Sequence, residues 1–217
     1  MTPRYDAIVL AGGRSSRMSG QAKPQLTVGE ATMLEHVLVA VRGAGRRVVV
    51  GPPQPAPDGV LVIQEQPVGS GPVTGVSAGL ASISASTVVV VAADLPFLTP
   101  AVIDMLIAAL GRSTAADVAL VVDRAGRDQF LLGAWRAAPL RTALGRLAPL
   151  PGRAMGELVR AVNVARIELP APGDAPAPWT DVDTPADLDR ARANHQARTR
   201  NETALSPENV RSDRPQK

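Results

Sequence analysis

The sequence predicts a single α/β domain in three layers, with helices on both faces of a mainly parallel sheet and a small antiparallel excursion. Short β-branched runs alternate with longer segments of helical period, which is the pattern of β/α units. The runs are almost continuously hydrophobic, as expected for strands that helices cover on both sides. With 217 residues, of which 45% are hydrophobic, the chain can build one sizeable core but is short for two.

The first half of the chain supplies the parallel part of this sheet. A helix is expected over 31–42, where apolar residues recur at helical spacing, and another over 100–110, because Thr99 and Pro100 form a typical helix start. A third, over 72–84, is rich in Gly, Ser and Ala, which predicts close packing against the sheet or against a ligand. Strands are expected at residues 7–10, 47–50, 60–63 and 87–91.

The second half changes character after residue 115. Two strand-like runs, 118–122 and 129–135, flank a turn over 123–128, which predicts the antiparallel excursion. Helices are expected at 138–147 and 155–162, followed by a strand at 164–169. A Pro/Ala-rich connector, 170–178, leads to a last helix that ends at about Asn194. Residues 1–194 are therefore expected to form the domain. The polar, mixed-charge residues 195–217 are expected to be a disordered tail.

Composition excludes several classes of function. The net charge is only +3 and the arginines are scattered, so the footprint of a nucleic-acid binder is missing. Without cysteine there is no disulfide, thiolate zinc site or thiol nucleophile, and the isolated His36 and His195 are assigned to structure or solvent. No apolar run approaches the ~18 residues of a membrane span, and no secretory leader is recognisable. These features predict a cytoplasmic protein that binds neither membranes nor nucleic acid.

The first predicted strand runs into a glycine-rich, basic loop. Leu10 and Ala11 lead into Gly12 and Gly13, whose backbone can turn sharply and bring N–H groups against a phosphate. Positive charge follows at Arg14, Arg17 and Lys23. The spacing is neither that of a Walker loop nor Gly-x-Gly-x-x-Gly. We interpret the loop as a cradle for a triphosphate.

Lys23 stands out by composition as well. Apart from the terminal Lys217 it is the only lysine among 23 basic residues, which suggests that a compact ammonium is needed at this point. The alternative is a surface turn with a chance lysine.

Asp94 follows the most hydrophobic predicted strand, in Asp94-Leu-Pro-Phe97. Ligands of open α/β sheets bind beyond the carboxyl ends of the strands, so this carboxylate is well placed to hold Mg²⁺ on a substrate phosphate. The alternative is that Asp94 only caps the following turn.

A second acidic segment lies near the end of the domain. Asp181 and Asp183 have the same-face spacing of an extended chain, so they can supply a further carboxylate to the same metal. Thr184, Pro185 and Asp187 form a good helix start and are explained by capping. For Asp181 and Asp183 a metal site and a turn remain equal alternatives.

The loop after the third predicted strand, 65–75, combines three glycines with two prolines. Its backbone amides can read the edge of a base, and Glu65 can accept from a guanine N–H or a ribose hydroxyl. For any single residue, Gly71 and Pro72 included, a plain glycine-rich connection is the alternative.

Four motifs in fixed order together resemble the molybdenum cofactor guanylyltransferase (MobA-like) family of nucleotidyltransferases. The resemblance covers residues 6 to about 193. It rests on Leu10-Ala-Gly-Gly-x-x-x-Arg17-Met18 with Lys23, Gly71-Pro-Val-Thr-Gly75, Asp94-Leu-Pro-Phe and Asp183-Thr-Pro-x-Asp-Leu188.

The resemblance implies a Rossmann-like fold of the nucleotide-diphospho-sugar transferase type. It also implies transfer of GMP from GTP, with Mg²⁺, to molybdopterin carrying molybdenum, and release of pyrophosphate. Molybdoenzymes or their chaperones are the implied protein partners. Carried onto this chain, Lys23, Arg17 and Asp94 are catalytic and Asp94 binds the metal. The nucleotide then contacts Leu10, Ala11, Gly12, Gly13, Lys23, Glu65, Gly71, Pro72 and Asp94.

The chain departs from the family pattern at several positions. Ala22 stands where the family usually has Asp, Gly51 where it has Asn, and Glu65 where it commonly has Asp. Asp181-Val-Asp183 replaces Asn-x-Asn and is more similar to the related cytidylyltransferases. A cytidylyltransferase or another NTP transferase is therefore one alternative function. A silent homologue that binds a molybdoenzyme is a second.

Overall fold

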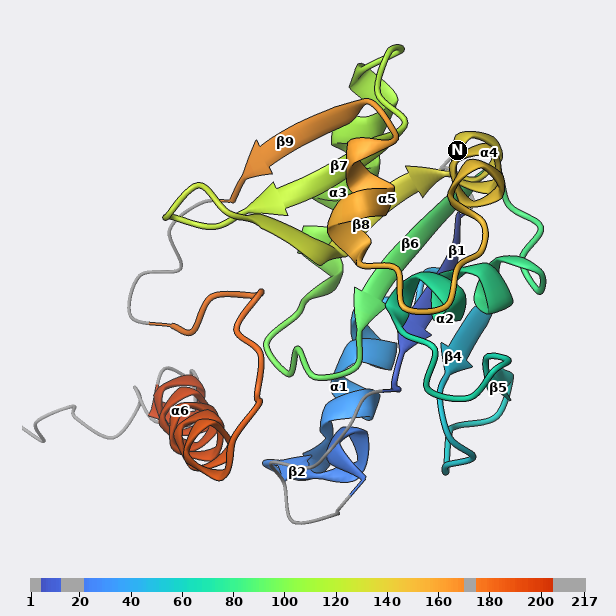
Figure 1. Ribbon diagram of the computed structural model, residues 1–217. Coiled ribbons are helices and arrows are strands. Elements are labelled where there is room, and N and C mark those ends of the chain that lie inside the picture. Colours follow the sequence, from blue (N-terminus) through green and yellow to red (C-terminus); the bar gives the residue numbers. More distant parts are fainter. Residues whose placement is uncertain (1–4, 13–21, 170–174, 205–217) are drawn as a thin grey trace, which may run out of the picture.

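The computed structural model describes residues 5–12, 22–169 and 175–204, the side chains of 201–204 excepted, and is built on one large sheet. The sheet has seven strands in the order β5-β4-β1-β6-β8-β7-β9 (Figure 1). The strands are β1 (Tyr5–Leu10), β4 (Arg47–Val50), β5 (Val60–Ile63), β6 (Thr87–Ala92), β7 (Val118–Val122), β8 (Asp128–Arg136) and β9 (Val164–Glu168). All seven correspond to strands that the sequence predicts.

One strand runs against the others. β1 pairs in parallel with β4 and β6, and β4 with β5. β8 is antiparallel to both β6 and β7, while β7 and β9 are parallel. Asp123 shapes the turn before β8 by accepting from the N–H groups of Ala125 and Arg127, at 2.9 Å each. The predicted mainly parallel sheet with an antiparallel excursion is confirmed, and β8 is the excursion.

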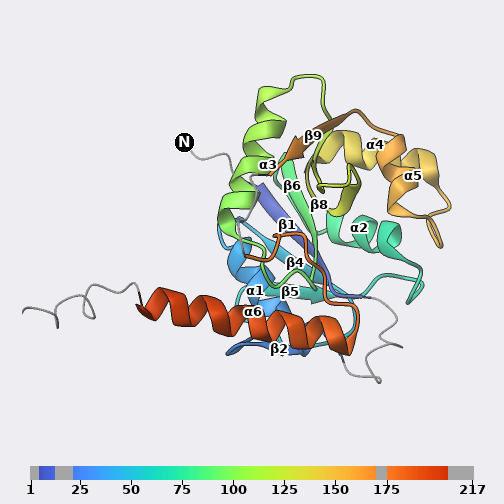
Figure 2. The same cartoon turned by 90° about the vertical axis from the view of Figure 1, so that its left-hand side faces the viewer.

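Helices cover both faces of the sheet, which gives three layers (Figure 2). α1 (Met33–Ala40) and α3 (Pro100–Arg112) lie on one face. The other face carries α2 (Pro72–Leu80), α4 (Ala137–Leu147) and α5 (Met155–Arg160). Each strand therefore buries side chains on both sides, as Val89 and Val88 of β6 do, which explains its continuous hydrophobic run.

The glycines of α2 allow this helix to lie close to β1. A methyl group on Gly79 would come within 2.8 Å of the Ile8 side chain, and one on Gly75 within 3.2 Å of Leu10. Of the two predicted packing partners, the sheet is the one observed. The helix ends at Leu80, four residues before the predicted end at residue 84.

The C-terminal helix is longer than predicted. α6 runs from Pro185 to Ala204, so the expectation that the helix ends near Asn194 and that a disordered tail starts at residue 195 is wrong for 195–204. Residues 205–217 lie outside the described part. Although α6 is the longest helix here, it is polar, and no helix in the described ranges is both long and apolar enough to cross a membrane.

The start of α6 is anchored by its own small core. Leu188 and Ala191 are buried with Val182, just before the helix, and with residues of distant segments, namely Val28, Met33 and Phe97. Val28 belongs to a short hairpin, β2 (Thr27–Val28) and β3 (Ala31–Thr32), that the sequence pattern did not predict. A two-residue strand carries no readable alternation, which is why it was missed.

A second contact holds α6 beyond Asn194. The His195 ring meets the His36 ring of α1 edge to face, with centroids 5.7 Å apart. It also packs against Gly29, where a methyl group would collide with it at 2.2 Å. The two histidines, isolated in the sequence, are therefore neighbours. Their contact is one that a sequence-based tail boundary cannot anticipate.

Candidate functional site

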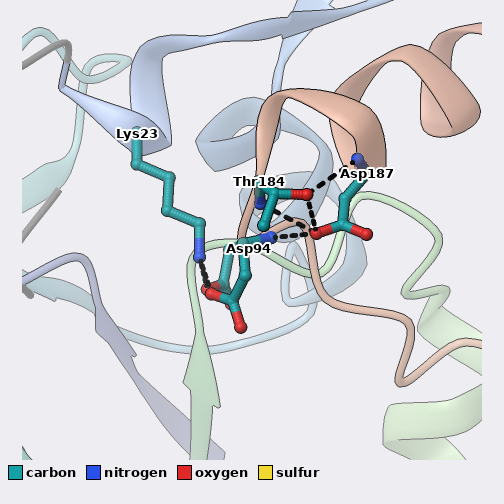
Figure 3. Close-up of polar contacts among 5 residues, drawn as sticks. Lys23, Asp94, Thr184 and Asp187 are labelled. Carbon is teal, nitrogen blue, oxygen red and sulfur yellow. Dashed lines mark hydrogen bonds and ion pairs between the residues drawn. The ribbon is translucent and has the colours of Figure 1, made fainter. Parts of the chain in front are cut away.

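A single ammonium group joins two carboxylates at the centre of the candidate site. Lys23 Nζ lies 2.6 Å from Asp94 Oδ2 and 2.6 Å from Asp183 Oδ1. The Lys23 and Asp94 side chains are only 17% and 24% exposed, whereas that of Asp183 is 52% exposed. Figure 3 shows the lysine side chain extended toward the carboxylate of Asp94. The three residues that the sequence singled out in separate motifs thus meet at one point.

Each partner is placed by a different local device. Asp94 comes two residues after β6, and its neighbour Ala93 donates to the Leu10 carbonyl at the end of β1 (3.0 Å). Lys23 starts a short 3₁₀ turn, η2 (Lys23–Gln25). Gln25 of that turn donates to the Gln54 side chain at 3.0 Å, which ties the turn to the loop after β4.

Asp183 reaches the site because it directly precedes the cap of α6. The Asp187 N–H donates to Thr184 Oγ1 at 3.2 Å, and Asp187 Oδ2 accepts from the Thr184 N–H at 2.8 Å (Figure 3). This is the reciprocal cap that the sequence predicts. Asp187 Oδ2 also accepts from the Asp183 N–H at 3.2 Å. The cap therefore orients the backbone of Asp183 while its carboxylate is left for Lys23.

The charges at the site perturb one another. Burial disfavours the Lys23 ammonium, but the adjacent Asp94 and Asp183 outweigh it, so the pKa of Lys23 is raised above its ordinary value. Partial burial, with the negative charges of Asp183 and Asp94, raises the pKa of Asp181. Lys23 is therefore firmly cationic. A third carboxylate stands close enough to feel the same charges.

A cavity of about 280 Å³ opens beside the ammonium. It lies beyond the carboxyl ends of β1, β4 and β6, where open α/β sheets bind their ligands. Among its lining residues are Leu10, Ala11, Gly12, Lys23, Asp94 and Asp183, all predicted for the site. Gly13 and Arg17, also predicted for it, lie outside the described residues.

A second cavity, of about 410 Å³, adjoins the first, and both are lined by Leu10, Gly12, Pro52 and Asp94. The predicted residues Glu65, Gly71 and Pro72 line its other side. Glu65 is only 8% exposed, and one of its oxygens accepts from the Gly69 N–H at 2.9 Å. Glu65 thus shapes its own loop in addition to facing the cavity.

The loop after β4 belongs to the site but was not predicted. Pro52, Pro53 and Gln54 line the smaller cavity. The available signal was position, because the loop follows the carboxyl end of a parallel strand next to β1.

Gly51 in this loop explains one departure from the family pattern. A methyl group there would lie 2.7 Å from the Ala11 backbone, so the close approach of the two loops excludes a larger residue such as Asn without a backbone shift.

The donor set suits a hard cation that is shared with a ligand. In the part of the chain that the structure describes, no three acidic or histidine side chains converge on one point. Two carboxylates meet at Asp94 and Asp183, and the Lys23 ammonium already occupies the position of a cation between them. Carboxylate oxygens are the ligands that Mg²⁺ uses together with substrate phosphates and water. The geometry therefore fits a metal that gains its remaining ligands from a phosphate.

Comparison with known families identifies a domain over most of this fold. Residues 7–163 match the MobA-like NTP transferase domain. A probable molybdenum cofactor guanylyltransferase of Mycobacterium avium is 36% identical over 199 residues, which cover 88% of this chain and 95% of that protein. A probable enzyme of the same name from Pelotomaculum thermopropionicum is 30% identical, over 85% of this chain and 90% of the relative.

Solved structures share the fold at lower identity. Molybdopterin-guanine dinucleotide biosynthesis protein A from Archaeoglobus fulgidus superposes with a TM-score of 0.68 at 22% identity, over 87% of this chain and 97% of that one. A 2-C-methyl-D-erythritol 4-phosphate cytidylyltransferase from Thermus thermophilus gives 0.66 at 23% identity, over 89% and 99%. The predicted nucleotidyltransferase-type fold is confirmed.

Proposed function

Because the chain belongs to the MobA-like NTP transferase family, we propose that it transfers GMP from GTP to molybdopterin carrying molybdenum, with release of pyrophosphate. The names of its relatives support the guanylyl group and this acceptor. The observation that carries the proposal is the Lys23 ammonium between Asp94 and Asp183, beyond the strand ends. Nucleoside triphosphates are made and used in the cytoplasm, so we propose that location as well.

The proposed binding residues fall into two groups, one for each cavity. In the smaller cavity, the backbone of Leu10, Ala11 and Gly12 and the ammonium of Lys23 bind the triphosphate, with Gly13 and Arg17 as further contacts. In the larger cavity, Glu65, Gly71 and Pro72 receive the base and ribose. Asp94 and Asp183 would hold Mg²⁺, with Asp181 as a third carboxylate nearby. When bound, the ion supplies charge neutralisation on phosphate oxygens.

The transfer itself needs positioning more than proton transfer. A terminal phosphate oxygen of the acceptor bonds to the α-phosphorus, and the bond from that phosphorus to the bridging oxygen breaks, so pyrophosphate leaves. The attacking oxygen is already anionic, so no general base is required. Lys23 holds the phosphates in line and stabilises the charge that develops on them. Asp94 fixes Lys23 in the free protein.

Thermal denaturation with different nucleotides tests the proposal and its base preference. GTP with Mg²⁺ is expected to raise the midpoint temperature of unfolding. At a GTP concentration about 100 times the dissociation constant, the free energy of unfolding is expected to rise by about 2.7 kcal/mol. The Asp181-Val-Asp183 segment resembles that of cytidylyltransferases, so CTP is the informative comparison. Stabilisation by CTP alone would move the protein to that class. If neither nucleotide stabilises it, the transferase proposal fails and a silent binding module becomes the better explanation.

A pyrophosphate-release assay tests the residues. Lys23→Ala and Asp94→Ala are each expected to lower turnover about 100-fold or more, because each removes a charge next to the reacting phosphates. Arg46→Ala is the matched control: it also removes a positive charge, but from the residue just before β4, at the opposite end of the sheet. Wild-type turnover in both site variants would show that the site is misassigned.

A further inference from the structure

The Lys23 ammonium stands where a divalent ion shared by the two carboxylates would stand. It approaches an oxygen of Asp94 and an oxygen of Asp183 equally, at 2.6 Å each. These carboxylates come from segments 89 residues apart in the chain. The Lys23 ammonium thus places a positive charge at the point where the proposed reaction needs a metal.

Electrostatic repulsion disfavours the binding of a divalent ion while the Lys23 ammonium occupies this position. Like charges a few ångströms apart repel strongly where water is partly excluded, and Lys23 is only 17% exposed. Within the described residues no group of three acidic or histidine side chains is arranged to hold a metal ion, so a divalent ion would depend on the two carboxylates that Lys23 already pairs with.

A triphosphate changes this balance. The side chain of Lys23 is long and flexible and lines the same cavity as Ala11 and Gly12. Phosphate oxygens in that cavity can therefore accept the ammonium without displacement of η2. The same oxygens complete the coordination of an ion on Asp94 and Asp183, because Mg²⁺ normally takes part of its shell from substrate phosphates.

We infer that Lys23 keeps the Asp94–Asp183 pair closed to free divalent cations and opens it when a triphosphate draws the ammonium away, so that ion and nucleotide bind together. This inference rests on the proposed function, since it takes the two carboxylates as metal ligands. Lys23 therefore acts before the nucleotidyl transfer begins. The lysine excludes the metal from the free protein and then moves to the phosphates.

Calorimetric titration of the nucleotide-free full chain with Mn²⁺ tests the inference. The wild type is expected to bind the ion weakly, and Lys23→Met to bind it at least about tenfold more tightly, because the competing charge is gone. Adding Asp183→Asn to Lys23→Met is expected to abolish the gain. Arg46→Met, which removes a charge far from the site, is expected to leave the affinity at the wild-type value.

Two results would overturn the inference: equal Mn²⁺ affinity in wild type and Lys23→Met, or an equal gain in Arg46→Met, which would reveal a general charge effect. If Lys23→Met does not fold, Lys23→Gln is titrated instead with the same expectations, since it keeps a hydrogen-bond donor without the charge. Stabilisation of the wild type by GTP is measured separately. If GTP does not stabilise the wild type, the proposed function is refuted. If Lys23→Met gains no Mn²⁺ affinity, only the exclusion of the metal by Lys23 is refuted.

Discussion

At the scale of single residues, Asp6 shows that a buried carboxylate can serve structure alone. It is 3% exposed and accepts hydrogen bonds from the N–H groups of Arg46, Ser84 and Ala85, at 2.9, 2.8 and 2.9 Å. It therefore satisfies the ends of two loops at the start of β1. Asp94, by contrast, is paired with the side chain of Lys23 at the opposite, carboxyl end of the sheet. Position relative to the strand ends separates the two roles.

Replacing Asp6 is expected to destabilise the protein without touching the site. Asp6→Ala removes the acceptor of the Arg46, Ser84 and Ala85 N–H groups, which lie in partly buried hydrogen bonds, and this costs about 3 kcal/mol. Urea denaturation measures the loss, and GTP binding by the remaining folded protein is expected to be unchanged. Asp58→Ala, at an exposed loop position, serves as the control and is expected to stay within about 0.5 kcal/mol. A comparable loss in both variants would contradict the explanation.

At the scale of elements, α1 begins with a reciprocal cap. The Glu35 N–H donates to Thr32 Oγ1 at 3.1 Å, and Glu35 Oε2 accepts from the Thr32 N–H at 2.7 Å. The backbone and side chain of Thr32 hold the pKa of Glu35 below its ordinary value of 4.5. A carboxyl group with a lowered pKa in the folded state stabilises the fold above its ordinary pKa. That contribution disappears as the pH falls through the folded-state pKa.

The pH dependence of this cap can be measured directly. Glu35→Gln is expected to be less stable than the wild type at neutral pH, because the charged acceptor is lost. The difference in the free energy of unfolding is expected to shrink below pH 4.5 and vanish in stronger acid, where Glu35 is neutral too. Chemical denaturation at a series of pH values, from about 3 to about 7, measures this difference. A difference that stays constant with pH would exclude the charge as its cause.

At the scale of the whole molecule, α6 connects the end of the chain to the segment that follows Lys23. Leu188 packs with Val28 and Met33, and Arg192 donates to the Thr27 carbonyl at 3.0 Å. Asp183 lies two residues before this docked helix. The position of one carboxylate in the site therefore depends on apolar packing outside it.

Leu188→Ala tests this connection. The variant is expected to lose about 2 to 3 kcal/mol of stability, because it leaves a cavity in a small core. Stabilisation by GTP with Mg²⁺ is expected to weaken as well, since Asp183 is held less firmly. Asp189→Ala, at an exposed position of the same helix, is the control for both measurements. Unchanged stabilisation by GTP in Leu188→Ala would show that the site does not depend on the docking of α6.

All seven strands of the large sheet could be predicted from the sequence, because hydrophobic runs and helical periods are local properties. The same locality located Lys23, Asp94 and the Glu65 loop, since each follows a strand or lies in a loop with a readable composition. The tertiary structure decided what no local pattern contains. It joined Lys23 to Asp183 across 160 residues, brought Gly51 against Ala11, and extended α6 through the contact of His195 with His36. These features depend on which segments pack together, and that is a property of the whole fold.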